Sequence, residues 1–179
     1  MGRIFGEVGL WVADITVLGA ILALIEIVME RERGWASAFD ERGLGRKLLA
    51  GNPVVRWIDK PYVTAYHVLV FGALLPGVLW TQYRIGVLAG FDFGSGPWHS
   101  VAAFLYFFSA FLTICVFEDF LWFALNWYYP RSLTDLLAGN IWWHTDWVQL
   151  GPAVKLPRCY LSVGAIALIL LLLSFALAK

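Results

Sequence analysis

The chain has 179 residues, of which 60% are hydrophobic and 15% are charged. Soluble domains carry nearer a quarter of charged residues, so this composition excludes a typical soluble enzyme. The 13 basic and 13 acidic residues cancel, which gives no net field for nucleic acid, and two cysteines are too few for a disulfide-rich secreted domain. The composition indicates an all-α, polytopic integral membrane protein with a single domain over residues 1–179.

Four stretches are long and apolar enough to cross a bilayer, which requires about 20 residues of helix. In chain order they cover residues 10–29, 62–82, 98–128 and 161–178. The second contains His67 and is interrupted by Pro76 and Gly77, whereas the last contains no charged residue inside it. We therefore predict a bundle of four transmembrane helices joined by two long loops and one shorter loop.

Lysine and arginine are divided unevenly between the predicted loops. Ten of them lie in the first and third loops, and three lie in the N-terminal segment, the second loop and the C-terminus. Because basic residues accumulate on the cytoplasmic side, both long loops are expected to be cytoplasmic and both termini non-cytoplasmic, in a bacterial-type inner membrane. The first apolar stretch contains Asp14 and Glu26, so it is not expected to be a cleaved signal peptide.

Two loop segments carry signals for short interfacial helices. Residues 35–49 mix apolar and basic side chains, as in a helix that lies on anionic lipid, although two glycines interrupt them. In the third loop, Ser132 and Asp135 resemble a capping box. They predict a short helix over residues 133–138 that ends at Gly139.

Ionisable side chains inside the membrane cost roughly 2.5–3.5 kcal/mol each at mid-span, so a helix that carries them needs water, a partner or a metal. Glu118 and Asp119 form such a pair toward the inner end of the third span. Other acid and imidazole groups are expected at the same depth: Glu26, His67, His144 and Asp146. We predict that these six side chains face one cavity beneath the inner headgroups.

Carboxylates and imidazoles from several helices suit a zinc, iron or manganese centre, and they suit a proton relay equally well. The predicted ligands of a divalent transition metal are Glu26, His67, Glu118 and His144. The predicted catalytic groups, which would act as general acid or base, are Glu118, Asp119 and Asp146. The predicted substrate-binding side chains are Trp122, Asn126, Trp142, Trp143 and Trp147.

These residues predict a small membrane-embedded enzyme, dependent on a metal, that acts on a lipid or isoprenoid at the cytoplasmic leaflet. A second hypothesis is a proton- or cation-coupled transporter or channel that uses the same carboxylates, which the interrupted second helix favours. A third is an accessory or scaffold subunit, because interfaces are also rich in tryptophan and tyrosine. The expected partners are membrane lipids, with a homo-oligomer or a larger membrane complex left open, and no nucleic acid.

Each group also has a purely structural interpretation. Glu118 and Asp119 would be neutralised at the membrane boundary by a basic residue, namely Arg56, Lys60 or Arg131. Glu26 would point toward Arg31, Arg33 or water. His67 would be a neutral imidazole bonded to a nearby hydroxyl or carbonyl. The two cysteines, Cys115 and Cys159, are predicted at different depths, which argues against a thiol redox site. No nucleophile-elbow motif supports a Ser-His-Asp triad.

Overall fold

The computed structural model of this chain describes residues 2–34, 40, 42–53, 55, 62–80 and 99–177. The fold is mostly helical, at 67%. Three helices are long and apolar enough to cross a membrane: Trp11–Glu30, Ser100–Leu125 and Arg158–Leu177. They correspond to the first, third and fourth predicted spans, and this agrees with a protein that associates with membranes.

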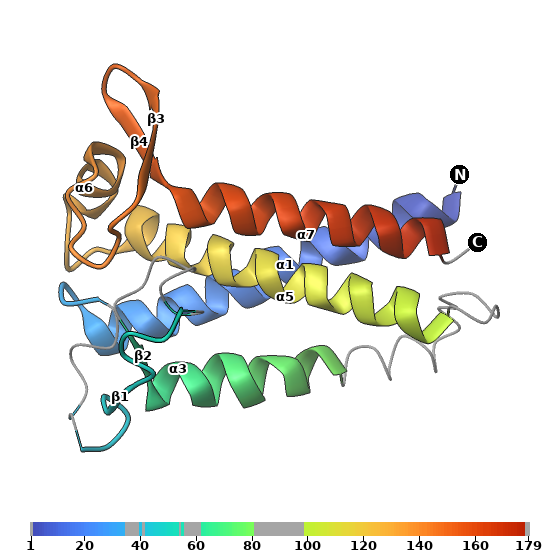
Figure 1. Cartoon of the computed structure of the whole chain (residues 1–179), viewed down its shortest axis with the longest axis horizontal. Coiled ribbons are helices and arrows are strands. Elements are labelled where there is room, and N and C mark those ends of the chain that lie inside the picture. Colours follow the sequence, from blue (N-terminus) through green and yellow to red (C-terminus); the bar gives the residue numbers. More distant parts are fainter. Residues whose placement is uncertain are drawn as a thin grey trace.

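The long helices lie side by side, with α5 in the centre (Figure 1). Helix α1 is Gly2–Glu30, α5 is His99–Leu125 and α7 is Arg158–Leu177. Helix α1 begins and α7 ends at one end of the bundle, whereas the strands and the short helix α6 gather at the other. We call this second end, where α1 and α5 finish and α7 begins, the loop end.

The second predicted span contains a shorter apolar helix, Ala65–Trp80. It begins with α3, Ala65–Leu69, and continues as a π-helical turn, η1, over Val70–Leu74, in which the N–H of Leu75 bonds to the carbonyl of Val70. Pro76 follows Leu75. In a regular α-helix the ring of a proline clashes with the carbonyl four residues earlier, and the wider π turn relieves this clash. The predicted interruption is therefore a π turn inside a continuous helix. Its crossing of the membrane stays a proposal, because residues 81 and 82 lie outside the described residues.

Two reciprocal hydrogen bonds join α5 to α7. The hydroxyl of Ser109 on α5 donates to the carbonyl of Ala167 at 2.7 Å, and the hydroxyl of Ser174 on α7 donates to the carbonyl of Ala102 at 2.8 Å. Both serine side chains are buried. Small hydroxyl residues of this kind allow close helix approach and hydrogen-bond across helices where no water competes.

Apolar side chains cover the outside of the long helices, as expected for contact with lipid tails. Exposed examples from α1, α5 and α7 are Val17, Ile21, Val28, Phe104, Phe108, Leu168, Ile169 and Leu172. Inside, one apolar cluster joins α1, the second helix and α5 through Ile15, Leu22, Tyr66, Val70, Leu75, Leu79 and Ile114. A second cluster at the loop end contains Ile27, Trp122, Phe123, Leu136, Ile141, Trp143, Cys159 and Tyr160.

The loop end contains two small antiparallel sheets that the all-α prediction lacked. Strand β1, Lys47–Leu48, pairs with β2, Val63–Thr64, and β3, Trp147–Gly151, pairs with β4, Val154–Pro157. The interfacial helix predicted over residues 35–49 is wrong for residues 42–48, which form turns and β1; residues 35–39 and 41 lie outside the described residues.

Helix α6, Ser132–Ala138, stands where a short helix was predicted in the third loop, and Gly139 ends it at φ 78°. The predicted capping box is wrong, because no side chain caps this helix. The hydroxyl of Ser132 donates instead to the carbonyl of Phe123, at 2.6 Å, and so ties α6 to the end of α5. That α6 lies at a membrane interface stays a prediction.

Candidate functional site

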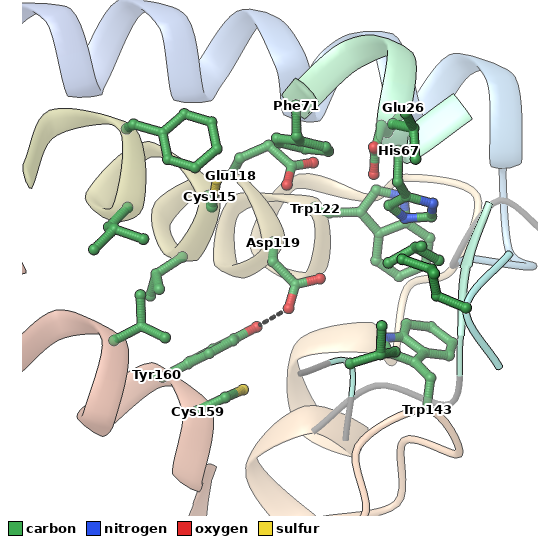
Figure 2. A pocket seen from close by; sticks show the side chains of 18 of the residues that line it. Glu26, His67, Phe71, Cys115, Glu118, Asp119, Trp122, Trp143, Cys159 and Tyr160 are labelled. Carbon is green, nitrogen blue, oxygen red and sulfur yellow. Dashed lines mark hydrogen bonds between the residues drawn. The ribbon is translucent and has the colours of Figure 1, made fainter. Parts of the chain in front are cut away.

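A cavity of about 430 Å³ lies beside α5 near the loop end (Figure 2). Its walls come from α1, α3 and η1, α5 and α7, together with Leu49, Val55 and Val63 from the first loop and β2, and Trp143 from the third loop. The lining is mainly apolar but includes eight polar or thiol side chains: Glu26, Glu30, His67, Cys115, Glu118, Asp119, Cys159 and Tyr160. Leu49 and Val68 line it while exposed by 57% and 49%, so the cavity opens on the outside of the bundle.

Acidic side chains from α1 and α5 meet in this cavity. The carboxyl groups of Glu26 and Glu118 point toward one another in Figure 2. Glu118 is only 4% exposed, and its Oε1 atom has no hydrogen-bond partner in the part of the chain that the structure describes. No lysine or arginine occurs among the described residues that line the cavity.

The predicted neutralisation of Glu118 and Asp119 by Arg131 is wrong, and the other two predicted partners, Arg56 and Lys60, lie outside the described residues. The guanidinium of Arg131 lies 3.7 Å from Oδ1 of Asp135, its neighbour one turn along α6, and its side chain is 78% exposed. Nor does Glu26 point away from the bundle, since it lines the cavity. Arg31, one of its suggested partners, lies instead over the ring of Tyr128, with 5.5 Å from Cζ to the ring centroid.

Asp119 turns away from Glu118 toward α7 and the third loop. The hydroxyl of Tyr160 donates to Oδ2 of Asp119 at 2.7 Å, and Nε2 of His144 lies 3.3 Å from the same oxygen. The His144 ring is enclosed by aromatic neighbours, with its centroid 5.5 Å from that of Trp147 and 5.6 Å from that of Tyr160. This arrangement holds the imidazole in one orientation behind the carboxylate.

His67 serves as the third residue of a capping box at the start of α3. The backbone N–H of Thr64 donates to Nδ1 of His67 at 3.3 Å, and the N–H of His67 donates to the hydroxyl of Thr64 at 3.4 Å. Because a backbone donor reaches Nδ1, that atom is an acceptor, and the neutral ring carries its proton on Nε2. The structural interpretation of His67 therefore agrees with the geometry, and the ring lines the cavity at the same time.

The predicted metal ligands do not form a coordination set. Among the described residues, no group of three or more His, Cys, Asp or Glu side chains is placed to hold a metal ion. Nδ1 of His67 is occupied by Thr64, and His144 lies behind Asp119 rather than in the cavity lining. The described residues thus form no set of metal ligands, and metal dependence stays a prediction from the sequence.

Two predicted site residues lie elsewhere. The carboxylate of Asp146 lies 2.7 Å from Nε of Arg158, and both side chains are largely exposed. Asn126 is buried, and its side chain joins the ends of two helices: Nδ2 donates to the carbonyl of Arg31 at 2.6 Å, and Oδ1 accepts from the backbone N–H of Tyr128 at 3.0 Å. Neither lines the cavity, so the prediction that they face it is wrong.

The four predicted tryptophans divide into two that line the cavity and two that do not. Trp122 and Trp143 line it and meet edge to face, with ring centroids 5.8 Å apart. Trp142 is 55% exposed, and Trp147 packs behind His144. The indole N–H groups of Trp122 and Trp143 are buried and have no hydrogen-bond partner in the described part of the chain. Such donors lose free energy unless a ligand or water pairs with them.

Among the polar and thiol side chains of this cavity, the sequence prediction missed four: Glu30, Cys115, Cys159 and Tyr160. The two cysteines were assigned to different depths, yet both line the same space. Glu30 follows Glu26 by one turn, so the helical repeat was a signal for it. Tyr160 lies one residue before the predicted start of the last span, and nothing in the sequence pattern singled it out.

Comparison with known proteins assigns no function. No protein-family model matches the chain, and no curated protein or solved structure is similar to it. The cavity is therefore the structural basis for a functional proposal.

Proposed function

We propose that this protein is a membrane-embedded enzyme that takes a lipid-like molecule into the cavity beside α5 and acts on its polar head. The observation that carries the proposal is the set of buried polar atoms that lack partners within an apolar space. These are Oε1 of Glu118 and the indole N–H groups of Trp122 and Trp143. A ligand that pairs with all three would recover their desolvation cost.

The lining defines the chemistry of such a ligand. Apolar walls and a rim formed by Leu49 and Val68 suit a hydrocarbon or isoprenoid chain that arrives from the lipid. Glu118 offers an acceptor and the two indoles offer donors, so the head should carry both a hydroxyl or amine and a carbonyl or ether oxygen. Without a lysine or arginine among the described lining residues, a phosphate head is disfavoured.

The carboxyl groups provide acid–base chemistry for this ligand. Glu26 and Glu118 face one another, and two carboxyls held close in an apolar site do not both ionise readily. One protonated and one ionised carboxyl constitute a general acid and a general base within reach of the same ligand. The proposal needs no metal, although metal analysis of the purified protein remains a direct test of the prediction from the sequence.

Ligand retention tests the proposal. The protein is purified into nanodiscs of defined lipid, and the molecules that stay bound are extracted and measured by mass spectrometry. We expect a retained lipid in the wild type and about tenfold weaker retention in the variants, because Trp143→Phe loses a buried donor and Glu118→Gln replaces a carboxylate acceptor by a weaker, neutral amide. Glu32→Gln is the matched control, since Glu32 is exposed and does not line the cavity. Equal retention in all four proteins overturns the proposal.

A proton-coupled transporter is the second candidate. The facing carboxyls of Glu26 and Glu118 and the π turn in the second helix favour it, because π turns inside helices are frequent at functional sites. Proton flux into proteoliposomes that stops in Glu118→Gln and persists in Glu32→Gln would select this candidate. If Ala variants of Glu118, Asp119, His67 and His144 left all measured properties unchanged, the scaffold hypothesis would replace both.

The proposed topology has four crossings, with the loop end on the cytoplasmic side. Basic residues concentrated in the first and third loops support this orientation. Ala153 lies in the exposed turn between β3 and β4, so Ala153→Cys provides a labelling site there. A membrane-impermeant maleimide should label it in inverted membrane vesicles and leave it unlabelled in right-side-out vesicles; the reverse pattern inverts the orientation.

A further inference from the structure

A thiol, an imidazole and a carboxylate form a chain at the wall of the cavity. Sγ of Cys159 lies 4.0 Å from Nδ1 of His144, and Nε2 of His144 lies 3.3 Å from Oδ2 of Asp119. The three come from the first turn of α7, the third loop and α5. Each ring nitrogen of His144 therefore faces a different partner, which is the order of groups in a cysteine nucleophile with its base and orienting acid.

The hydrogen-bond polarity of this chain suits proton removal from the thiol. A carboxylate only accepts, so the contact with Asp119 places the imidazole proton on Nε2 and leaves the lone pair of Nδ1 toward Cys159. Tyr160 holds Asp119 from a second side with its 2.7 Å hydrogen bond. The His144 side chain is fully buried, so its orientation is set by packing.

Cys159 differs from the other cysteine in the same cavity. Both thiols line it, and neither forms a disulfide. Among the described residues, no histidine is hydrogen-bonded to Cys115, whereas His144 faces Cys159. Activation of a thiol depends on an adjacent base. The chain thus contains its own matched control for thiol reactivity.

From this geometry, and resting on the proposed lipid site, we propose that Cys159 is a nucleophile that accepts an acyl group from a lipid ester. Sγ attacks the ester carbonyl carbon as Nδ1 of His144 takes the thiol proton. The carbon–oxygen bond of the ester then breaks, and the leaving alcohol oxygen receives that proton from His144. The product is a thioester on Cys159 and a free alcohol, with no change in oxidation state.

Release of the acyl group repeats these steps in reverse. Water or a second alcohol attacks the thioester carbonyl, His144 takes its proton, and the departing sulfur of Cys159 recovers that proton. The unpartnered indole N–H groups of Trp122 and Trp143 are the donors available to the carbonyl oxygen, where negative charge develops. Acyl transfer or hydrolysis therefore gives a role to Cys159, His144 and Asp119, which the acid–base proposal for Glu26 and Glu118 does not use.

Acylation by an activated ester tests the inference. The full chain in nanodiscs is incubated with p-nitrophenyl palmitate, and hydroxylamine-labile palmitoyl groups are located by peptide mass spectrometry. We expect wild-type protein to be acylated at Cys159 and not at Cys115, and Cys159→Ser to form no labile adduct. His144→Gln should slow the acylation of Cys159 by about 100-fold, the usual contribution of a general base.

Asp119 acts through His144 and is a positioning residue, so its test separates rate from binding. Asp119→Asn should lower the maximal acylation rate and leave the ester concentration for half-maximal rate unchanged. If the two cysteines of the wild type are acylated equally, or if neither is acylated, the inference is overturned. This outcome does not depend on whether any variant folds. Retained lipid without acylation refutes the nucleophile alone, whereas acylation of Cys159 without a retained lipid refutes the proposed binding site.

Discussion

The phenol of Tyr160 on α7 and the carboxylate of Asp119 on α5 are joined by a 2.7 Å hydrogen bond inside the bundle. The same Oδ2 atom lies 3.3 Å from Nε2 of His144. The carboxylate on α5 is thus held from two sides, by the first turn of α7 and by the third loop that precedes it. This contact fixes the position of the first turn of α7, where Cys159 lies.

Removal of the Tyr160 hydroxyl should weaken the fold. Tyr160→Phe keeps the ring and loses the donor, so we expect the free energy of unfolding to fall by about 1 kcal/mol, as for other hydrogen bonds within membrane bundles. Equilibrium unfolding in mixed micelles measures the change. Tyr128→Phe is the control, because Tyr128 is exposed. An equal change in both variants would show that the Asp119 contact contributes nothing specific.

The two serine contacts between α5 and α7 should contribute additively. Ser109→Ala and Ser174→Ala each remove one buried hydrogen bond and should each lower the unfolding free energy by about 0.6 kcal/mol. The two hydrogen bonds share no residue, since their acceptors are Ala167 on α7 and Ala102 on α5. The loss of unfolding free energy in the double variant should therefore be the sum of the two single losses. The hydroxyl of Ser162 bonds only within α7, and Ser162→Ala should leave helix association unchanged. A double variant no weaker than either single variant would contradict independent contacts.

Most of the helical architecture could be predicted because bilayer thickness fixes the length of an apolar helix. The same argument placed Glu26, His67, Glu118 and Asp119 at one depth, and all four line one cavity. However, the depth of a residue in the membrane does not determine which way its side chain points around the helix. Asn126 and Asp146 were assigned to the site at a suitable depth, yet Asn126 caps a helix end and Asp146 pairs with Arg158 on the surface.

The third loop could not be predicted in the same way, because its structure depends on tertiary contacts. Strands β3 and β4 are short, and the tryptophans at residues 142, 143 and 147 were all assigned to substrate binding. In the structure Trp143 packs into the cavity wall and Trp147 donates from Nε1 to the carbonyl of His144 at 3.1 Å. These contacts place His144 behind Asp119, which no spacing in the sequence indicated.

Gly34 should be required for the position of Trp143. Gly34 has φ +60°, and a Cβ atom there would clash with the indole ring of Trp143. Gly34→Ala should therefore cost about 1–3 kcal/mol of unfolding free energy through backbone strain and the clash. Because Trp143 lines the cavity, the variant should also lose the retained lipid. Gly164→Ala is the control, since nothing lies within 4 Å of a Cβ atom at that position; equal stability of the two variants would contradict this role of Gly34.

The contact between Tyr129 and Asp135 should make stability depend on pH in the alkaline range. The hydroxyl of Tyr129 donates to Oδ2 of Asp135 at 2.5 Å. This hydrogen bond, then partial burial and the Asp135 charge, raise the pKa of Tyr129 above its usual value, and Arg131 opposes the shift. Because the pKa is higher in the folded state, the stabilisation is complete below the unfolded value of about 10 and disappears as the pH rises through the folded value.

Comparison of the wild type with Tyr129→Phe isolates this effect, because phenylalanine has no proton to lose. The difference in their unfolding free energies should be constant from about pH 7 to about pH 9 and should shrink above about pH 10, as ionisation of tyrosine favours the unfolded chain. Denaturant titrations at several pH values measure it. Asp135→Asn should reduce the dependence, since it removes the charge that holds the proton on Tyr129. If the wild type and Tyr129→Phe lost stability in parallel, the alkaline transition would belong to another group.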